Sequence, residues 1–292
     1  EAYSDEADVT VTEGFLELNA DSSNDVDASA LAFSISGLVG GYGTVSDNTD
    51  STSTTATIRN GGVIEAPVVR LRARDDSLLD ADGGGLAVSL NAGAGATLSR
   101  NTMTTKVEAG IGAATVETTG GNVDILAVSS HDVDALGIGF SLAGAIGGVG
   151  TASMNEITDT TRAFIDDDAT VTSGGAVLVV SLDDSSFDAD AGGVGAGAIV
   201  GAGLSFASTK VVNTVESIIT GEDTEVAAET SVSVHATLSP SAGATATGFS
   251  VSAFASASGA VSIAESGGKA NAAITGKAKV SGGPVSIRAT AD

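Results

Sequence analysis

The chain has 292 residues, with 12 Lys and Arg against 37 Asp and Glu, which gives a formal net charge of -25. The charge argues strongly against nucleic acid as a partner and disfavours an anionic membrane surface, because both require cationic contacts. The chain has no Cys, no Trp, 3% aromatic residues and 39 Gly, so a core must be built from Val, Ile, Leu and Ala. A thin interior of this kind suits stacked sheets better than a broad globular core.

An alternating apolar segment recurs along the chain at a nearly fixed interval. It reads LELNA, VRLRA, VDILA, VLVVS, VSVHA and VSIRA in turn, at intervals of 53 to 55 residues. A second signature, Ala-x-Ile or a close variant, keeps the same interval, as at Ala109 and Ile111. A fixed period combined with period-two alternation is typical of stacked β-architectures. The segments begin at Leu16, Val69, Val123, Val177, Val232 and Val285.

The period predicts an all-β fold, a β-solenoid (β-helix-like) of about five repeats of roughly 54 residues, which form a single array over residues 1–292. Each repeat contributes several short strands, and neighbouring repeats bury each other's faces. The period leaves open whether one repeat forms one large rung or two smaller ones. The predicted repeats are 16–68, 69–122, 123–176, 177–231 and 232–284, with a further repeat beginning at 285.

A long uncharged run rich in Gly and Ala recurs in the repeats, as in LGIGFSLAGAIGGVG from Leu136 to Gly150. The run approaches the length of a transmembrane helix, but its Gly content disfavours a helix and its Ser and Thr supply period-two alternation. No Gly-Lys-Ser/Thr follows these runs, which disfavours a phosphate-binding loop. We therefore expect no membrane span, and we expect strands inside the solenoid with small residues on both faces.

Stacked repeats place equivalent positions in columns, and one predicted column is acidic. Asp27, Asp80, Asp134 and Asp188 each follow the end of the opening strand by seven residues, and the fifth repeat has Gly243 there. With one rung per repeat these carboxylates would stack about 4.8 Å apart, where like charges repel. The four residues are candidate calcium ligands, because Ca²⁺ takes carboxylate oxygens. The alternative is a solvated acidic edge, since neither an EF-hand loop nor a calcium-roll nonapeptide is present.

A second predicted column holds Asn48, Asn101 and Asn155, whose amides can hydrogen-bond up and down a stack. We assign these three residues a structural role. The fourth repeat departs from the pattern and places Lys210 or Asn213 nearby.

The residues needed for catalysis do not come together in the sequence, so we expect no enzyme. The two histidines are His131, which falls in an acidic turn, and His235, which falls on the alternating strand of another repeat. A shared metal site or acid–base pair is therefore disfavoured.

Three arginines, Arg70, Arg72 and Arg74, alternate along one predicted strand. Alternate residues share a face, so we expect these side chains to pair with Asp75, Asp76 or the neighbouring acidic turns.

The recurrent pattern V-x-V-x-A-x-S … G-A-G … N … A-x-I-x-x-x-A-x-V covers essentially the whole chain. It resembles the repetitive β-helical regions of very large secreted bacterial proteins, including filamentous-haemagglutinin-like and leukotoxin-like adhesins. The resemblance implies a non-catalytic stalk or fibre in an extracellular or bacterial cell-surface location. Two alternatives stay open. One is a β-helix that binds or cleaves surface polysaccharide, and the other is an ice- or mineral-binding face suggested by Thr-rich stretches such as STSTTAT, TMTTK and TDTTR.

The two ends of the chain suggest self-association. The chain begins shortly before one opening strand and stops just after another, so we expect open strand edges that associate end to end or continue into further repeats. Residues 232–292 hold four basic side chains, Arg288 and three lysines, against two acidic ones, whereas the preceding residues are strongly acidic. A basic end that meets the acidic end of another copy would propagate as a filament.

Overall fold

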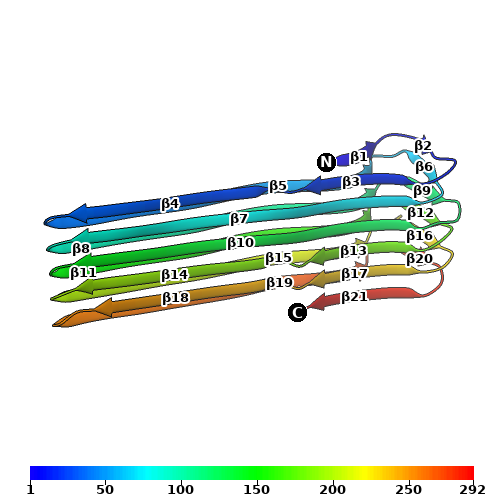
Figure 1. The fold of residues 1–292 in the computed structure, drawn as a ribbon. Coiled ribbons are helices and arrows are strands. Elements are labelled where there is room, and N and C mark those ends of the chain that lie inside the picture. The colour runs from blue at the N-terminus through cyan, green and yellow to red at the C-terminus, as the bar shows by residue number, and fades with distance from the viewer.

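The computed structural model describes all 292 residues and is a β-solenoid in which one repeat of about 54 residues forms one rung. In each rung the chain runs out along a long strand, turns tightly, returns along a second long strand and closes through a short strand. In the second rung these strands are β7 (Val69–Ser89), β8 (Ala92–Gly112) and β9 (Thr115–Thr118). Figure 1 shows the rungs stacked from blue to red, with the tight turns at one end and the short strands at the other.

The outward-running strands form a nine-stranded sheet, here called the outgoing sheet. All its pairings are parallel and join equivalent positions of neighbouring repeats, as in Val69 with Val123 and Val123 with Val177. In three rungs a short break divides the outgoing strand in two. Its strands are β3 (Leu16–Ser22), β4 (Asp25–Ser36), β7, β10 (Val123–Ala143), β13 (Val177–Asp183), β14 (Ser186–Gly197), β17 (Val232–Leu238), β18 (Ser241–Val251) and β21 (Val285–Ala291).

The remaining strands form two further parallel sheets of six strands each. The return sheet lies behind the outgoing sheet, and the short sheet closes the wide end of each rung. The return sheet contains β1 (Ala2–Asp5), β5 (Val39–Arg59), β8, β11 (Ile146–Asp166), β15 (Val200–Ile219) and β19 (Ala255–Ile274). The short sheet contains β2 (Val9–Thr10), β6 (Val63–Ala66), β9, β12 (Thr170–Ser173), β16 (Glu225–Ala228) and β20 (Lys279–Ser281).

The main hydrophobic core fills the wide end, where the three sheets meet. Its 27 buried residues are mostly Val, Ile, Leu and Ala from the opening segments, the short strands and the ends of the return strands. These are the positions of the Ala-x-Ile signature, as at Ala109 and Ile111, which are both fully buried. The signature recurs because each rung must present the same apolar residues, one set from each of the three sheets, to the rungs above and below it.

The interior changes character from the wide end towards the turns. Beyond the main core comes a layer of buried polar side chains, followed by a second apolar cluster that includes Leu79, Met103 and Phe187. The Asn column and a small Ala cluster come next. The part nearest the turns, here called the blade, comprises residues 83–99 of the second rung and their equivalents, and its interior holds mostly Gly, Ala, Ser and Thr.

The blade does not have small residues on both faces, so that expectation is wrong for its outer side. Alternate residues point in and out, and the inward ones are small because the two sheets approach closely. A Cβ on Gly195 would overlap the carbonyl oxygen of Ala202 in the facing sheet. Many outward positions instead carry large apolar side chains, such as Phe33, which is 67% exposed, and Leu142, which is 55% exposed.

Glycine in the blade interior is required by this close approach, and a matched pair of substitutions tests it. A Cβ on Gly147 would overlap the carbonyl oxygen of Ala196, whereas a Cβ on Gly148 would meet nothing within 4 Å. We predict that Gly147→Ala lowers the free energy of unfolding by about 1–3 kcal/mol, as expected for overpacking. Gly148→Ala should be neutral. Urea denaturation measures both, and equal effects of the two substitutions would contradict the close packing of the blade.

Candidate functional site

The three predicted asparagines stack inside the solenoid between the second apolar cluster and the blade. Asn48 donates from Nδ2 to Oδ1 of Asn101 at 3.0 Å, and Asn101 donates in the same way to Asn155 at 3.1 Å. Each amide also donates to an outgoing-sheet carbonyl at 2.6 Å. The fourth rung places Thr209 in this column, in place of the Lys210 or Asn213 expected, and its hydroxyl donates to the carbonyl of Gly243 at 2.6 Å. The stacked amides thus tie the two long sheets together.

The predicted acidic column lies on the outer face of the outgoing sheet. Parallel pairing places Asp27 beside Asp80, Asp80 beside Asp134, and Asp134 beside Asp188, with Gly243 next. Burial, and after it the charges of the neighbouring carboxylates, first that of Asp132, together raise the pKa of Asp134 to about 6. Burial and adjacent carboxylates also raise the pKa of Asp80. The carboxylates line a shallow depression of about 470 Å³ bounded by Asp80, Asp82, Asp134, Ala135, Leu136, Asp188 and Asp190.

The acidic column has the ligand type that calcium prefers but not a formed cation site. No group of three or more Asp, Glu or His side chains is arranged to hold a metal ion. The side chains stand along a flat sheet, so neighbours point in the same direction instead of converging on one point. Calcium binding by these residues stays a prediction.

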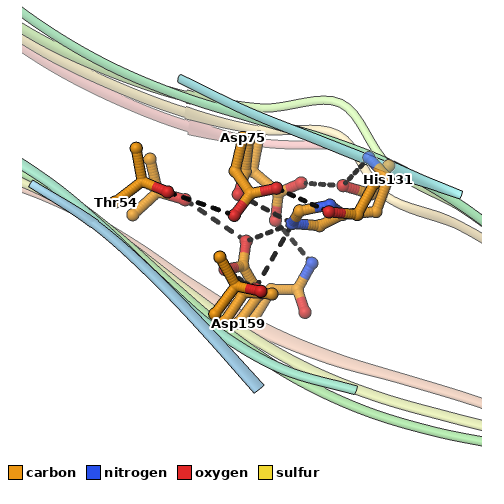
Figure 2. A network of polar contacts seen from close by, with 12 residues as sticks. Thr54, Asp75, His131 and Asp159 are labelled. Carbon is orange, nitrogen blue, oxygen red and sulfur yellow. Dashed lines mark hydrogen bonds and ion pairs between the residues drawn. The ribbon is translucent and has the colours of Figure 1, made fainter. Parts of the chain in front are cut away.

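A different group of polar residues is buried in the layer between the two apolar clusters (Figure 2). Asp75, His131 and Asp183 point inward from the outgoing sheet and face Thr105 and Asp159 of the return sheet. All of the titratable groups among them are at most 2% exposed. Buried ionisable groups are rare unless they are paired or hydrogen-bonded, so each one requires a partner.

The imidazole of His131 is held by hydroxyl groups in the centre of this layer. Its Nε2 lies 3.0 Å from Oγ of Ser129, 3.3 Å from Oγ1 of Thr105 and 3.9 Å from a carboxylate oxygen of Asp159. Because Thr105 donates its hydroxyl proton to Asp159, its oxygen accepts from His131, which places a proton on Nε2. Nδ1 has no hydrogen-bond partner.

The buried carboxylates are satisfied by hydroxyl and amide donors. Asp75 accepts from Ser77 at 2.6 Å, and Asp183 accepts from Ser185 at 2.6 Å and from Nδ2 of Asn213. Burial raises the pKa of Asp183 from 3.8 to about 7, with a smaller contribution from the charge of Asp159, and these hydrogen bonds only partly oppose the rise. Burial also raises the pKa of Asp75. Charge in this layer is therefore costly at neutral pH.

The buried polar layer is closed to solvent, which limits what it can do chemically. The side chains of His131 and Asp159 are 0% and 1% exposed, so a substrate cannot reach them without opening of the rungs. The layer has the residue types of an acid–base site but the environment of a structural network. Its effect is on stability and its dependence on pH.

Sequence reasoning missed this layer because it misplaced two of its residues. His131 lies within strand β10 and points inward, not in an acidic turn. Asp75 was expected to pair with arginine, but it points inward, and Arg74 pairs instead with Asp76 at 2.6 Å. The available signal was the alternation itself, since Asp75 is two residues beyond the buried Ala73 and therefore shares its inward face.

The outer surface bears on the two alternative functions, an ice- or mineral-binding face and a β-helix that binds or cleaves polysaccharide. Outward Thr residues of the return sheet do not form a regular array, because Lys106 and Glu108 interrupt it in the second rung and Glu156 and Arg162 in the third. A groove of about 580 Å³ on the outgoing sheet contains two phenylalanines, Phe33 and Phe140, but its other lining residues are mostly aliphatic or Gly. A sugar site requires several polar groups to fix orientation.

No helix in the structure is long and apolar enough to cross a membrane. Comparisons with protein-family models, curated proteins and solved structures find no match to this chain.

The raised pKa of Asp183 in the buried polar layer should make the free energy of unfolding fall as the pH rises from about 4 to 7. In this window Asp183 is protonated in the folded state and ionised in the unfolded state, so folding takes up a proton, and above pH 7 the folded state holds a buried charge. We predict that Asp183→Asn stabilises the protein at pH 8 and flattens this dependence. Asp184→Asn, which changes an exposed neighbour, should do much less. Urea denaturation from pH 4 to 8 measures both, and an unchanged profile in Asp183→Asn would contradict the raised pKa.

Repulsion along the acidic column predicts a second stabilising substitution. The pKa of Asp134 is raised to about 6, so its ionisation opposes folding above that pH. Asp134→Asn should raise Tm at pH 8, and the difference from wild type should vanish near pH 4. Asp76→Asn is the control for this substitution, since it loses the pair with Arg74 and should not stabilise.

Calcium tests the same column, because the calcium hypothesis requires millimolar Ca²⁺ to raise Tm of wild type but not of Asp80→Asn/Asp134→Asn.

Proposed function

We propose that this chain is a non-catalytic structural segment, a stalk or fibre, of a bacterial extracellular adhesin or surface filament. The observation that supports the proposal is the unbroken parallel register of all rungs. Each long strand pairs with the equivalent residues of the neighbouring repeats, without a bulge that shifts the register. A regular stack of this kind transmits load along one axis and extends by addition of identical units.

The distribution of hydrogen bonds favours a load-bearing role. Of 210 backbone hydrogen bonds, 174 lie within the strands, and parallel pairing directs them from one rung to the next. The stacked Asn48, Asn101 and Asn155 amides add side-chain bonds in the same direction. Pulling along the stack therefore loads many bonds in parallel, which suits a stiff spacer.

Ion pairs between rungs weaken the electrostatic argument for an end-to-end contact between copies. Lys277 pairs with Glu222 at 2.5 Å and Lys279 with Glu225 at 2.5 Å, each in the preceding rung. The lysines of the basic end are thus already neutralised within the chain. End-to-end stacking, between copies or as continuation into further repeats, would therefore use backbone pairing between rungs in place of these charges.

The dimensions show why a stalk requires many stacked units. Five rungs rise only about 24 Å at 4.8 Å per rung, whereas a 21-residue strand is about 70 Å long. One such array is a slab that is wider than it is tall. We propose that reach comes from stacking slabs along the rung axis.

A covalent tandem tests whether the arrays extend in register. Ala291 occupies the same column as Ser22, through the pairings of Asp75, Ser129, Asp183 and Leu238. A fusion of residues 1–291 to residues 23–292 should therefore continue the stack and fold as one slab. We predict that electron microscopy shows about twice the height of the single array and that unfolding stays a single transition at higher denaturant.

The matched control carries one extra residue at the junction. A one-residue shift turns inward side chains outward, so this fusion should give two separate slabs with the stability of the single array. Two separate slabs from the in-register fusion as well would contradict the proposed stalk.

A further inference from the structure

The outer face of the blade is an apolar surface formed by three columns of outward side chains on the outgoing sheet, here called the blade face. Several members are exposed even in the third rung, which has a neighbouring rung on each side, among them Ile138 at 38%, Phe140 at 45% and Leu142 at 55%. No charged residue occurs in the corresponding chain segments, such as 83–99 and 135–155. The columns contain Leu31, Gly84, Ile138, Gly192 and Thr247; Phe33, Leu86, Phe140, Val194 and Phe249; and Ile35, Val88, Leu142, Ala196 and Val251.

The relief of the blade face alternates between projections and hollows. In the first column Leu31 and Ile138 project, and Gly84 between them leaves a hollow. This hollow is the groove of about 580 Å³, and Phe33 and Phe140 stand at its sides. A projecting side chain of a facing surface can enter this hollow.

The size of the blade face is close to that of a small contact between proteins. Three outward columns take up six residues of each strand, so five rungs at about 4.8 Å and six residues at about 3.3 Å give a footprint of about 475 Å² per face. Two such footprints amount to about 950 Å², close to the roughly 1,000 Å² expected of a biological interface. The largest apolar patch of a typical monomer is of about this size and is often functional.

We propose that the blade face is covered by the blade face of a second copy, in a two-fold dimer whose blades overlap and whose wide ends point in opposite directions. Flat sheets bury an apolar face by packing on another sheet about 10 Å away. This inference does not depend on the stalk proposal, because it concerns the side of the stack and not its ends.

The acidic column selects this orientation over the alternative. Asp82 and Asp190 border the blade face on the side towards the wide end, and Asp80, Asp134 and Asp188 stand in the next outward column. If both blades pointed the same way, the acidic columns of the two copies would face each other and repel. With the two-fold axis parallel to the stack, the columns lie at opposite borders of the contact. Each rung then faces the same rung of the other copy.

Sedimentation equilibrium at several protein concentrations tests the dimer. Wild type should dimerise, and the dimer should persist or tighten in 1 M NaCl, because an apolar contact is not screened by salt. Phe33→Glu/Phe140→Glu should raise the dimer dissociation constant by about tenfold or more, since it removes buried aromatic area and introduces charge. The matched control is Val45→Glu/Val261→Glu on the opposite outer face, where these residues are 64% and 53% exposed. It should leave the dimer intact.

Cross-linking tests the orientation, and the absence of Cys makes single-Cys variants informative. Leu86 lies in the central column and in the second rung, so Leu86→Cys faces its own equivalent only if the axis is parallel to the stack. A short bis-maleimide reagent that spans about 10 Å should couple Leu86→Cys into dimers. Ser29→Cys, at the acidic border, should not couple.

Three results would overturn the proposal. Wild type that stays monomeric at high concentration would show that the blade face does not pair. A dimer unaffected by Phe33→Glu/Phe140→Glu but weakened by the Val45 control would place the contact on the other face. Partition of wild-type monomer into neutral phosphatidylcholine vesicles, abolished by Phe33→Glu/Phe140→Glu, would identify lipid as the occupant.

Discussion

Parallel pairing between equivalent residues of successive repeats is the constraint on which the rest of the structure depends. Because each rung finds its backbone partners in the rungs above and below it, every side chain is placed in a column of its own equivalents about 4.8 Å apart. A residue type survives at a repeated position only if it tolerates a neighbour of the same kind. Aliphatic side chains and amides stack favourably, whereas carboxylates repel each other.

This constraint explains how polar residues are distributed between the inside and the outside. Asn recurs inside in three successive rungs, and Asp recurs in four successive rungs only on the solvated face. Inside, no Asp pairs with an Asp of the next rung. Asp75 and Asp183 are separated by Ser129 in their column, and Asp159 lies between Thr105 and Asn213 in the column opposite. Neutral rungs thus keep the buried carboxylates apart, and the hydroxyl and amide groups of those rungs supply their hydrogen bonds.

The solenoid could be predicted from the sequence because its signal is repeated, whereas single irregular positions could not. The interval between Val69, Val123 and Val177 is the same interval that pairs them in the structure. Asp75 and His131 were misplaced because residue type and alternation pointed in opposite directions there, and polarity was taken as evidence of exposure. The outward position of Phe33 was missed for the converse reason. In a run where nearly every residue is small or apolar, alternation alone does not tell which face is inside.

The apolar outer face of the blade follows from how thin its interior is. Glycines such as Gly195 and Gly203 bring one sheet so close to the backbone of the other that no larger inward residue fits. Two larger residues do point inward, Val149 and Tyr42, and the ring of Tyr42 occupies the space left by Gly85 and Gly95. The large apolar side chains are therefore carried on the outside, where they are only partly buried and contribute less to the stability of a single copy than they would inside. A blade of this design holds its shape through pairing between rungs, while the hydrophobic contribution to its stability depends on what covers its outer face.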